Sequence, residues 1–102
     1  MTSSPIDLSS VRAKGVGFGA ETLIVDLMDG RILTVPIAWY PRLAHGTPME
    51  RTSWQLIGGG SGIHWPDLDE DLEVEDLLVG RRSGETAESL KRWLEQRRPA
   101  RS

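Results

Sequence analysis

The stretch that decides the fold is residues 22–35, which read Thr22-Leu-Ile-Val-Asp-Leu-Met28, Asp29-Gly30 and Arg31-Ile-Leu-Thr-Val35. Two apolar, β-rich runs flank an Asp-Gly pair. Because the tight turn between hairpin strands needs positive φ, this pattern is a strong signal for a β-hairpin. Residues 11–18 form a further extended run that leads into Gly19-Ala20, a plausible turn. The sequence therefore predicts a three-stranded antiparallel meander.

Pro36 ends that pattern, because proline cannot donate to a strand ladder. The following residues predict short elements: helical turns at 39–45 and 48–52, short strands at 54–57 and 63–65, and a helical face made by residues 74, 77 and 78. Pro41 is tolerated only in the first turn of its helix. The Gly58–Gly62 run is expected to be a connector with positive φ. These elements together predict the α+β class, with a small antiparallel sheet and short helices.

A longer amphipathic helix is predicted from residue 85 to about residue 97. Its apolar stripe contains Ala87, Leu90, Trp93 and Leu94, and Ser83 is a reasonable N-cap. The expected organisation is a flexible N-terminus at 1–10, one domain at 11–82, and an added C-terminal helix with a basic tail at 83–102. A length of 102 residues fits a single domain.

Composition excludes several classes of function. The chain has no cysteine, which removes disulfides, thiolate metal sites and cysteine nucleophiles, and fits a reducing compartment. The N-terminal residues lack the pattern of a signal peptide, and no apolar run approaches the ~20 residues that span a bilayer. We therefore expect a cytoplasmic protein with no membrane partner.

The net charge of −3 is unevenly distributed, because one segment of ten residues contains seven carboxylates and no base. Its members are Asp67, Asp69, Glu70, Asp71, Glu73, Glu75 and Asp76. Such a block repels phosphates and argues against specific nucleic-acid binding there. Asp67, Asp69 and Glu70 follow Trp65-Pro66, which is expected to present them as a rigid acidic edge. The block is thus predicted to be a recognition surface for a basic partner.

Several motifs in fixed order resemble domain-of-unknown-function family 2442 (DUF2442). They are Asp29-Gly30-Arg31, Val35-Pro36-Ile37, Trp39-Tyr40-Pro41-Arg42-Leu43, Glu50-Arg51 with Trp54, Gly58-Gly-Gly-Ser-Gly-Ile-His-Trp-Pro-Asp-Leu-Asp-Glu-Asp71, and Leu77-Leu78 with Gly80. The resemblance implies an α+β fold with a small antiparallel sheet. Relatives look like stand-alone bacterial proteins or modules joined to a helix-turn-helix domain, and some resemble partners in toxin–antitoxin-like gene pairs.

Two residues depart from the family pattern. Ser61 occupies a position where an aromatic residue is expected, and Glu73 one where Ser or Thr would cap the short helix. The second departure suggests that Asp71 or Glu73 supplies a weaker cap. We expect no helix-turn-helix domain in the residues after 82, so the resemblance does not carry direct DNA regulation over to this chain.

Nucleotide and calcium motifs fail in the glycine-rich and acidic segments. The Gly58–Gly62 run is followed by Ile63-His64, where a phosphate loop needs Lys and Ser or Thr, and Ile63 stands where a dinucleotide fingerprint needs its third Gly. The calcium-like start at Asp67 then places Leu72 and Leu78 where an EF-hand needs Gly and Glu.

The two histidines and the aromatic residues leave alternatives open. His64 could be oriented by Asp67 or Asp69 with Ser61 nearby, as in a hydrolase, but Ile63 breaks the nucleophile-elbow pattern. The simpler interpretation of His64 is a half-buried strand residue with a backbone partner. His45 is interpreted as a residue near a helix C-terminus. Most of the ring area is expected in the core, with one or two rings lining a groove or interface; the rings are Trp39, Tyr40, Trp54 and Trp65.

The sequence therefore favours a non-enzymatic protein-interaction module whose partner is a basic protein or a second copy. The resemblance adds the expectation of an antitoxin-like partner in a bacterial gene pair. The predicted contact residues are Ser61, His64, Trp65, Asp67, Asp69, Glu70 and Asp71. No cofactor, metal or catalytic residue is predicted. The alternatives are a small-ligand or metal binder using the same Gly58–Asp71 rim, and an enzyme of unrecognised type.

Overall fold

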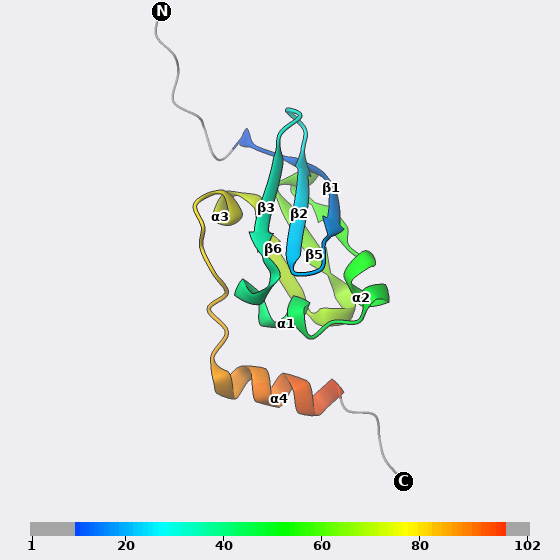
Figure 1. Cartoon of the computed structure of the whole chain (residues 1–102), viewed down its shortest axis with the longest axis vertical. Helices are drawn as coiled ribbons and strands as arrows, with labels where there is room; N and C mark the ends of the chain where they lie inside the picture. Colours follow the sequence, from blue (N-terminus) through cyan, green and yellow to red (C-terminus); the bar gives the residue numbers. More distant parts are fainter. Residues whose placement is uncertain (1–9, 98–102) are drawn as a thin grey trace, which may run out of the picture.

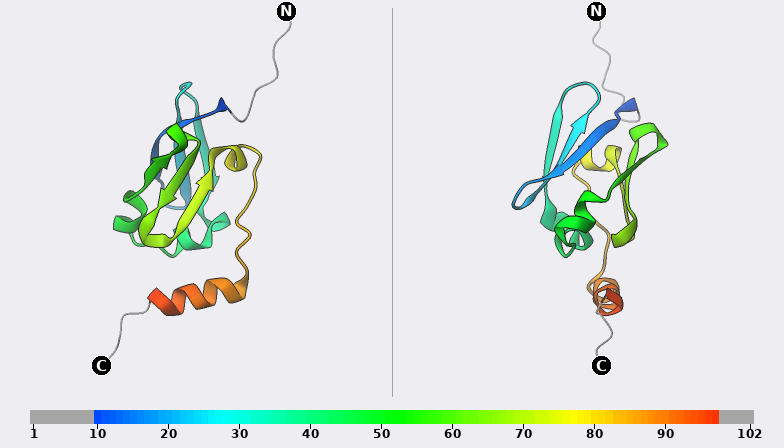
Figure 2. Two further views of the ribbon diagram at one scale, coloured as in Figure 1. Left: turned by 180° about the vertical axis from the view of Figure 1, so that it is seen from behind. Right: turned by 90° about the vertical axis from the view of Figure 1, so that its right-hand side faces the viewer.

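The computed structural model describes residues 10–97 and contains two three-stranded antiparallel sheets that lie as two layers (Figures 1 and 2). The first sheet has the order β1-β2-β3 and the second the order β4-β5-β6. Their strands are β1 (Ala13–Phe18), β2 (Thr22–Leu27), β3 (Ile32–Pro36), β4 (Gln55–Ile57), β5 (Gly62–Trp65) and β6 (Glu70–Glu73). The α+β class predicted from the sequence is confirmed.

The first sheet is the predicted meander. The turn between β2 and β3 contains Gly30 at φ 96°, and the amide of Arg31 donates to Oδ1 of Asp29 at 3.0 Å. Within β2, Leu23, Val25 and Leu27 are buried while the residues between them are only partly covered. This alternation places one face of the sheet in the core.

The second sheet contains a strand that was not predicted. β6 pairs with β5 and places Leu72 opposite Ile63. The prediction that this segment is an acidic edge leading into a helix is wrong for residues 70–73. Carboxylates have low strand propensity, and they hide an alternation in which Leu72 and Val74 are buried while Asp71, Glu73 and Glu75 are exposed.

Short helices connect the strands. They are the 3₁₀ turns η2 (Ile37–Trp39), η3 (Gly58–Gly60) and η4 (Pro66–Leu68), and the α-helices α1 (Pro41–Ala44), α2 (Pro48–Thr52) and α3 (Val74–Leu78). Pro41 occupies the first turn of α1, as predicted, and His45 is its C-cap. Each glycine of η3 has positive φ. Glu73 is the N-cap of α3 but its side chain makes no capping hydrogen bond.

The C-terminal helix α4 (Ala87–Arg97) lies below the two sheets (Figure 1). Trp93 is its buried residue, and the guanidinium groups of Arg42 and Arg97 lie 5.2 and 4.6 Å from the centre of that ring. Arg42 Nε donates to Glu85 at 2.6 Å, and Arg97 bonds both carboxylate oxygens of Glu50 at 2.6 and 2.8 Å. Such two-point Arg–carboxylate pairs are strong, so α4 is attached to the core.

The N-cap predicted for α4 is wrong. The Thr86 hydroxyl accepts from the amide of Ser89 at 3.0 Å, whereas the Ser83 hydroxyl accepts from the amide of Glu85, before the helix begins. Residues 1–9 of the predicted flexible N-terminus and residues 98–102 of the predicted basic tail lie outside the described residues. Within 10–97, no helix is long and apolar enough to cross a membrane.

Candidate functional site

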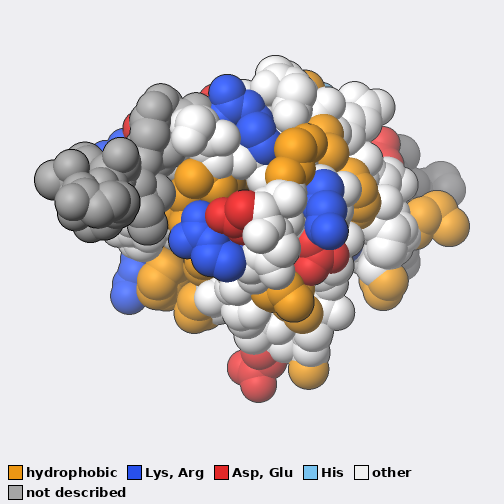
Figure 3. Space-filling view, turned by 90° about the horizontal axis from the view of Figure 1, so that it is seen from above, with side chains coloured by type: hydrophobic (Ala, Val, Ile, Leu, Met, Phe, Trp, Pro, Cys, Tyr) orange, Lys and Arg blue, Asp and Glu red, His pale blue; other side chains and the backbone are white. Residues whose placement is uncertain are grey.

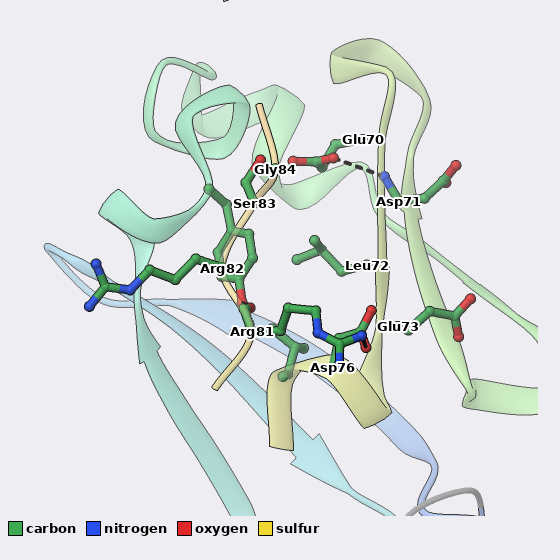
Figure 4. Close-up of a pocket in the computed structure, with 11 residues that line it drawn as sticks. Glu70, Asp71, Leu72, Glu73, Asp76, Arg81, Arg82, Ser83 and Gly84 are labelled. Carbon is green, nitrogen blue, oxygen red and sulfur yellow. Dashed lines mark hydrogen bonds and ion pairs between the residues drawn. The ribbon is translucent and has the colours of Figure 1, made fainter. Parts of the chain in front are cut away.

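The pairing of β5 with β6 divides the acidic block between two faces of the second sheet. His64 lies opposite Asp71, and the next pair is Trp65 with Glu70. Because successive strand residues point to opposite faces, His64 and Asp71 belong to the outer face, whereas Trp65 and Glu70 belong to the inner face. Glu73 joins the outer face, and Figure 4 shows the Asp71 and Glu73 side chains pointing away from Glu70.

The outer face is acidic and contains one imidazole. His64 Nδ1 donates to Oδ1 of Asp71 across the two strands, so the partner of His64 is this carboxylate and not the predicted backbone group, nor Asp67 or Asp69. Asp71 and Glu73 are exposed. Residues 53–80, which supply the whole second sheet and α3, contain no Lys or Arg. The segment that carries these carboxylates therefore supplies no Lys or Arg to neutralise them.

The predicted rigid edge of Asp67, Asp69 and Glu70 does not exist as one surface. Asp67 is exposed on η4, and Asp69 has a left-handed backbone with φ 51°. The carbonyl and the carboxylate of Asp69 both accept from Arg42 Nη1, at 2.9 and 3.4 Å. Glu70 points inward. The kink at Asp69 thus turns the three carboxylates in different directions.

Two other predicted contact residues have structural roles. Trp65 is fully buried, and its indole Nε1 donates to the carbonyl of Arg51 at 3.0 Å. The carbonyl of Ser61 accepts from the amide of Val74 at 2.9 Å, which joins the glycine turn to α3. Trp39 is half-buried beneath Arg82, whose guanidinium carbon lies 4.7 Å from its ring centre.

A pocket of about 270 Å³ lies on the inner side of β6 (Figure 4). Its walls are β6, α3 and residues 81–84, which cross its mouth as an extended strap. Three hydrogen bonds fasten the strap: Arg81 N to Asp76 O at 2.9 Å, Ser83 N to Trp39 O at 3.1 Å, and Tyr40 Oη to Arg81 O at 2.8 Å. Sequence patterns gave no sign of this pocket, because its walls meet only in three dimensions.

Glu70 is the unusual group of this pocket. Its Oε1 accepts from the amide of Asp71 at 3.2 Å. Burial, reinforced by the negative charges of Glu85 and Asp71, raises the pKa of Glu70 to about 7, although Arg42 and the Asp71 amide act in the opposite direction. The same burial raises the pKa of the Tyr40 phenol, with contributions from Asp76 and Glu70. The pocket thus disfavours negative charge on its own carboxyl group.

We expect Glu70→Gln to stabilise the protein at about pH 8 and to change little at about pH 4. The folded protein binds a proton at Glu70 more tightly than the unfolded chain does. The contribution of Glu70 to the free energy of unfolding is therefore fully present below pH 4.5 and is lost as the pH rises through about 7. Because the pocket is partly open, we expect a gain of only about 1–2 kcal/mol at the higher pH. Denaturant titrations at both pH values measure it. An equal effect at the two pH values would contradict the raised pKa.

Among residues 10–97, no three or more His, Asp or Glu side chains are grouped so that they could hold a metal ion. The predicted Gly58–Asp71 rim likewise does not enclose a common site, because Trp65 and Glu70 lie on the opposite face from His64 and Asp71. The structure therefore offers two separate places for function: the acidic outer face and the pocket that contains Glu70.

Comparisons with known proteins support the fold and assign no activity. A family model described as "Protein of unknown function (DUF2442)" matches residues 13–83. A crystal structure of a protein of unknown function from Rhodospirillum rubrum ATCC 11170 is similar with a TM-score of 0.65 and 25% sequence identity, over 79% of this chain and 98% of that chain. No curated protein matches the sequence.

Proposed function

Because this chain belongs to the DUF2442 family of proteins of unknown function, we propose its function from its own surface. The protein is a non-enzymatic interaction module that binds a basic protein on the outer face of β4-β5-β6. The basic partner is the second product of an antitoxin-like bacterial gene pair. The observation that carries this proposal is the absence of Lys and Arg from residues 53–80, a segment with seven carboxylates.

Charge on this face is available to a partner. Asp71 and Glu73 are exposed on β6, where Asp71 also accepts from His64, and Asp67 is exposed at the end of the sheet. Two other carboxylates of the segment are paired inside the molecule, Asp69 with Arg42 and Asp76 with Arg81. A face with one sign of charge steers an oppositely charged protein and excludes wrong partners. These properties suit recognition.

The end of the molecule opposite α4 does not carry charge of one sign. The end of the molecule that carries the β2–β3 turn, seen from above, shows basic, acidic and hydrophobic side chains intermixed (Figure 3). There, Asp29 is paired with Arg31 at 2.7 Å. Exposed pairs of this kind contribute little to binding or stability. The outer face of the second sheet is therefore the better candidate for a charge-selective contact.

We expect Asp71→Asn with Glu73→Gln to slow association with a basic partner by about threefold to tenfold at low ionic strength, and less at physiological salt. The matched control is Glu88→Gln with Glu95→Gln, which removes the same charge from exposed positions of α4. Affinity capture with the wild-type protein identifies partners, and stopped-flow mixing measures the association rate for each variant.

Two results would refute the proposal. The first is a captured partner that associates equally fast with both double variants. Net charge, and not a specific site on the outer face, would then determine the association rate. The second is unchanged binding of every captured partner by Asp71→Asn with Glu73→Gln. Melting curves of the variants check that folding is intact.

A further inference from the structure

The pocket behind β6 contains a carboxyl group without a cation of its own. Glu70 accepts one hydrogen bond through Oε1, and its Oε2 has no hydrogen-bond partner within residues 10–97. Arg42 is the positive charge that acts on it. However, the Nε and both Nη atoms of Arg42 already bond Glu85 and Asp69. The charge of Glu70 is therefore not neutralised by the protein.

The two arginines that line the pocket, Arg81 and Arg82, are also engaged. Arg81 Nη1 bonds Oδ1 of Asp76 at 2.9 Å. Arg82 lies over the Trp39 ring, and Figure 4 shows its side chain directed away from the pocket. Asp76 is thus paired, whereas Glu70 is not. A guest that carried a positive charge would supply the missing partner.

The rest of the pocket is suited to a short hydrocarbon chain. Leu72 and Leu77 are buried and line it together with the ring of Tyr40, whose hydroxyl is occupied by Arg81 O. A volume of about 270 Å³ falls just below the usual range of about 300–1,000 Å³ for ligand pockets. The guest is therefore small, with a few carbon atoms and one polar end.

We propose that this pocket binds a small primary amine, with the ammonium group against Glu70 and the alkyl chain on Leu72, Leu77 and Tyr40. The inference goes beyond the proposed function, because it uses the carboxyl group of Glu70 and the apolar side chains behind β6. The interaction proposal uses the exposed carboxylates of Asp71 and Glu73, which lie next to the pocket and point away from Glu70. A free amine and the side chain of a lysine both present this chemistry.

The test uses n-butylamine and the full-length protein, with binding followed by NMR chemical-shift titration. We expect saturable shifts at Leu72, Leu77 and the strap residues 81–84. Since the pKa of Glu70 is about 7 and an alkylammonium stays protonated, affinity is expected to rise roughly tenfold between about pH 6 and about pH 8. From other elements, Arg42 and Glu85 face Glu70, and their mutual pairing raises the pKa of Arg42 and lowers that of Glu85, so both keep their charge over that range. A lysine-containing tripeptide, tested beside butylamine, distinguishes the two sources of the amine.

Variants and analogues make the test specific. Glu70→Gln is expected to abolish the saturable shifts and the pH dependence, while Asp71→Asn with Glu73→Gln retains both, because these side chains point away. Sodium butyrate and 1-butanol, which have the same chain without the positive charge, are expected not to compete. Loss of butylamine binding in the outer-face variant, equal binding by Glu70→Gln, tighter binding of butyrate, or no saturable shift in the wild type would each overturn the proposal.

Discussion

Trp65→Ala is expected to lower the free energy of unfolding by about 3–5 kcal/mol, the cost of deleting a large buried aromatic side chain. Trp65 is fully buried between the two sheets, and its ring meets that of Phe18 edge-on at a centroid distance of 6.3 Å. The substitution also leaves the carbonyl of Arg51 without its indole donor. The cavity and the lost hydrogen bond both lower the free energy of unfolding.

Chemical denaturation measures this loss, with Trp39→Ala as the matched control. Trp39 is only half-buried and stacks against Arg82 at the surface, so truncation there removes less apolar area from the core. We expect Trp39→Ala to cost less than half as much as Trp65→Ala. Equal losses in the two variants would show that the two sheets do not close around Trp65.

Gly60→Ala is expected to destabilise the protein by about 2–4 kcal/mol, although it adds a single methyl group. Gly60 has φ +103°, and a Cβ atom there would lie 2.4 Å from the carbonyl oxygen and 3.2 Å from the amide nitrogen of Ala13. Both atoms are backbone of β1, so no side-chain rotation can relieve the contact. The substitution therefore forces the glycine turn away from the first sheet.

Gly59→Ala is the control for this effect. Gly59 also has positive φ, at +67°, but nothing lies within 4 Å of a Cβ atom at that position. Its substitution carries the conformational cost alone, about 1 kcal/mol. The difference in melting temperature between the two variants isolates the contact between η3 and β1, and two equal values would show that this contact is absent in solution.

Local chemistry made part of the fold predictable. The Asp29-Gly30 turn, Pro41 in the first turn of α1 and the positive φ of the glycines in η3 all depend on residues close in sequence. The strand β6 was missed because strand propensity was judged from its carboxylates, whereas its pairing with β5 depends on Leu72 meeting Ile63. A search for residues alternating from 70 to 75 could have found it.

The candidate site was less predictable for the same reason. The composition of the acidic block assigned Glu70 and Asp71 to one surface, whereas the alternation of side chains along β6 places them on opposite faces. The pairing of His64 with Asp71 follows from register. The pocket needs Tyr40 and residues 81–84 at the same place, a tertiary fact that no local pattern contains.

The attachment of α4 has a consequence for the response to acid. Arg97, with help from the Thr47 amide, lowers the pKa of Glu50 to about 2, and Arg42 likewise lowers that of Glu85. The contribution of each pair to stability is present above about pH 4.5 and decreases at lower pH; that of Glu50 is lost as the pH falls toward 2. Glu70 acts in reverse, since its burial favours the fold at low pH. The two arginine pairs thus set the acidic limit of the stability optimum, and Glu70 sets its alkaline limit. The optimum therefore lies in mildly acidic solution.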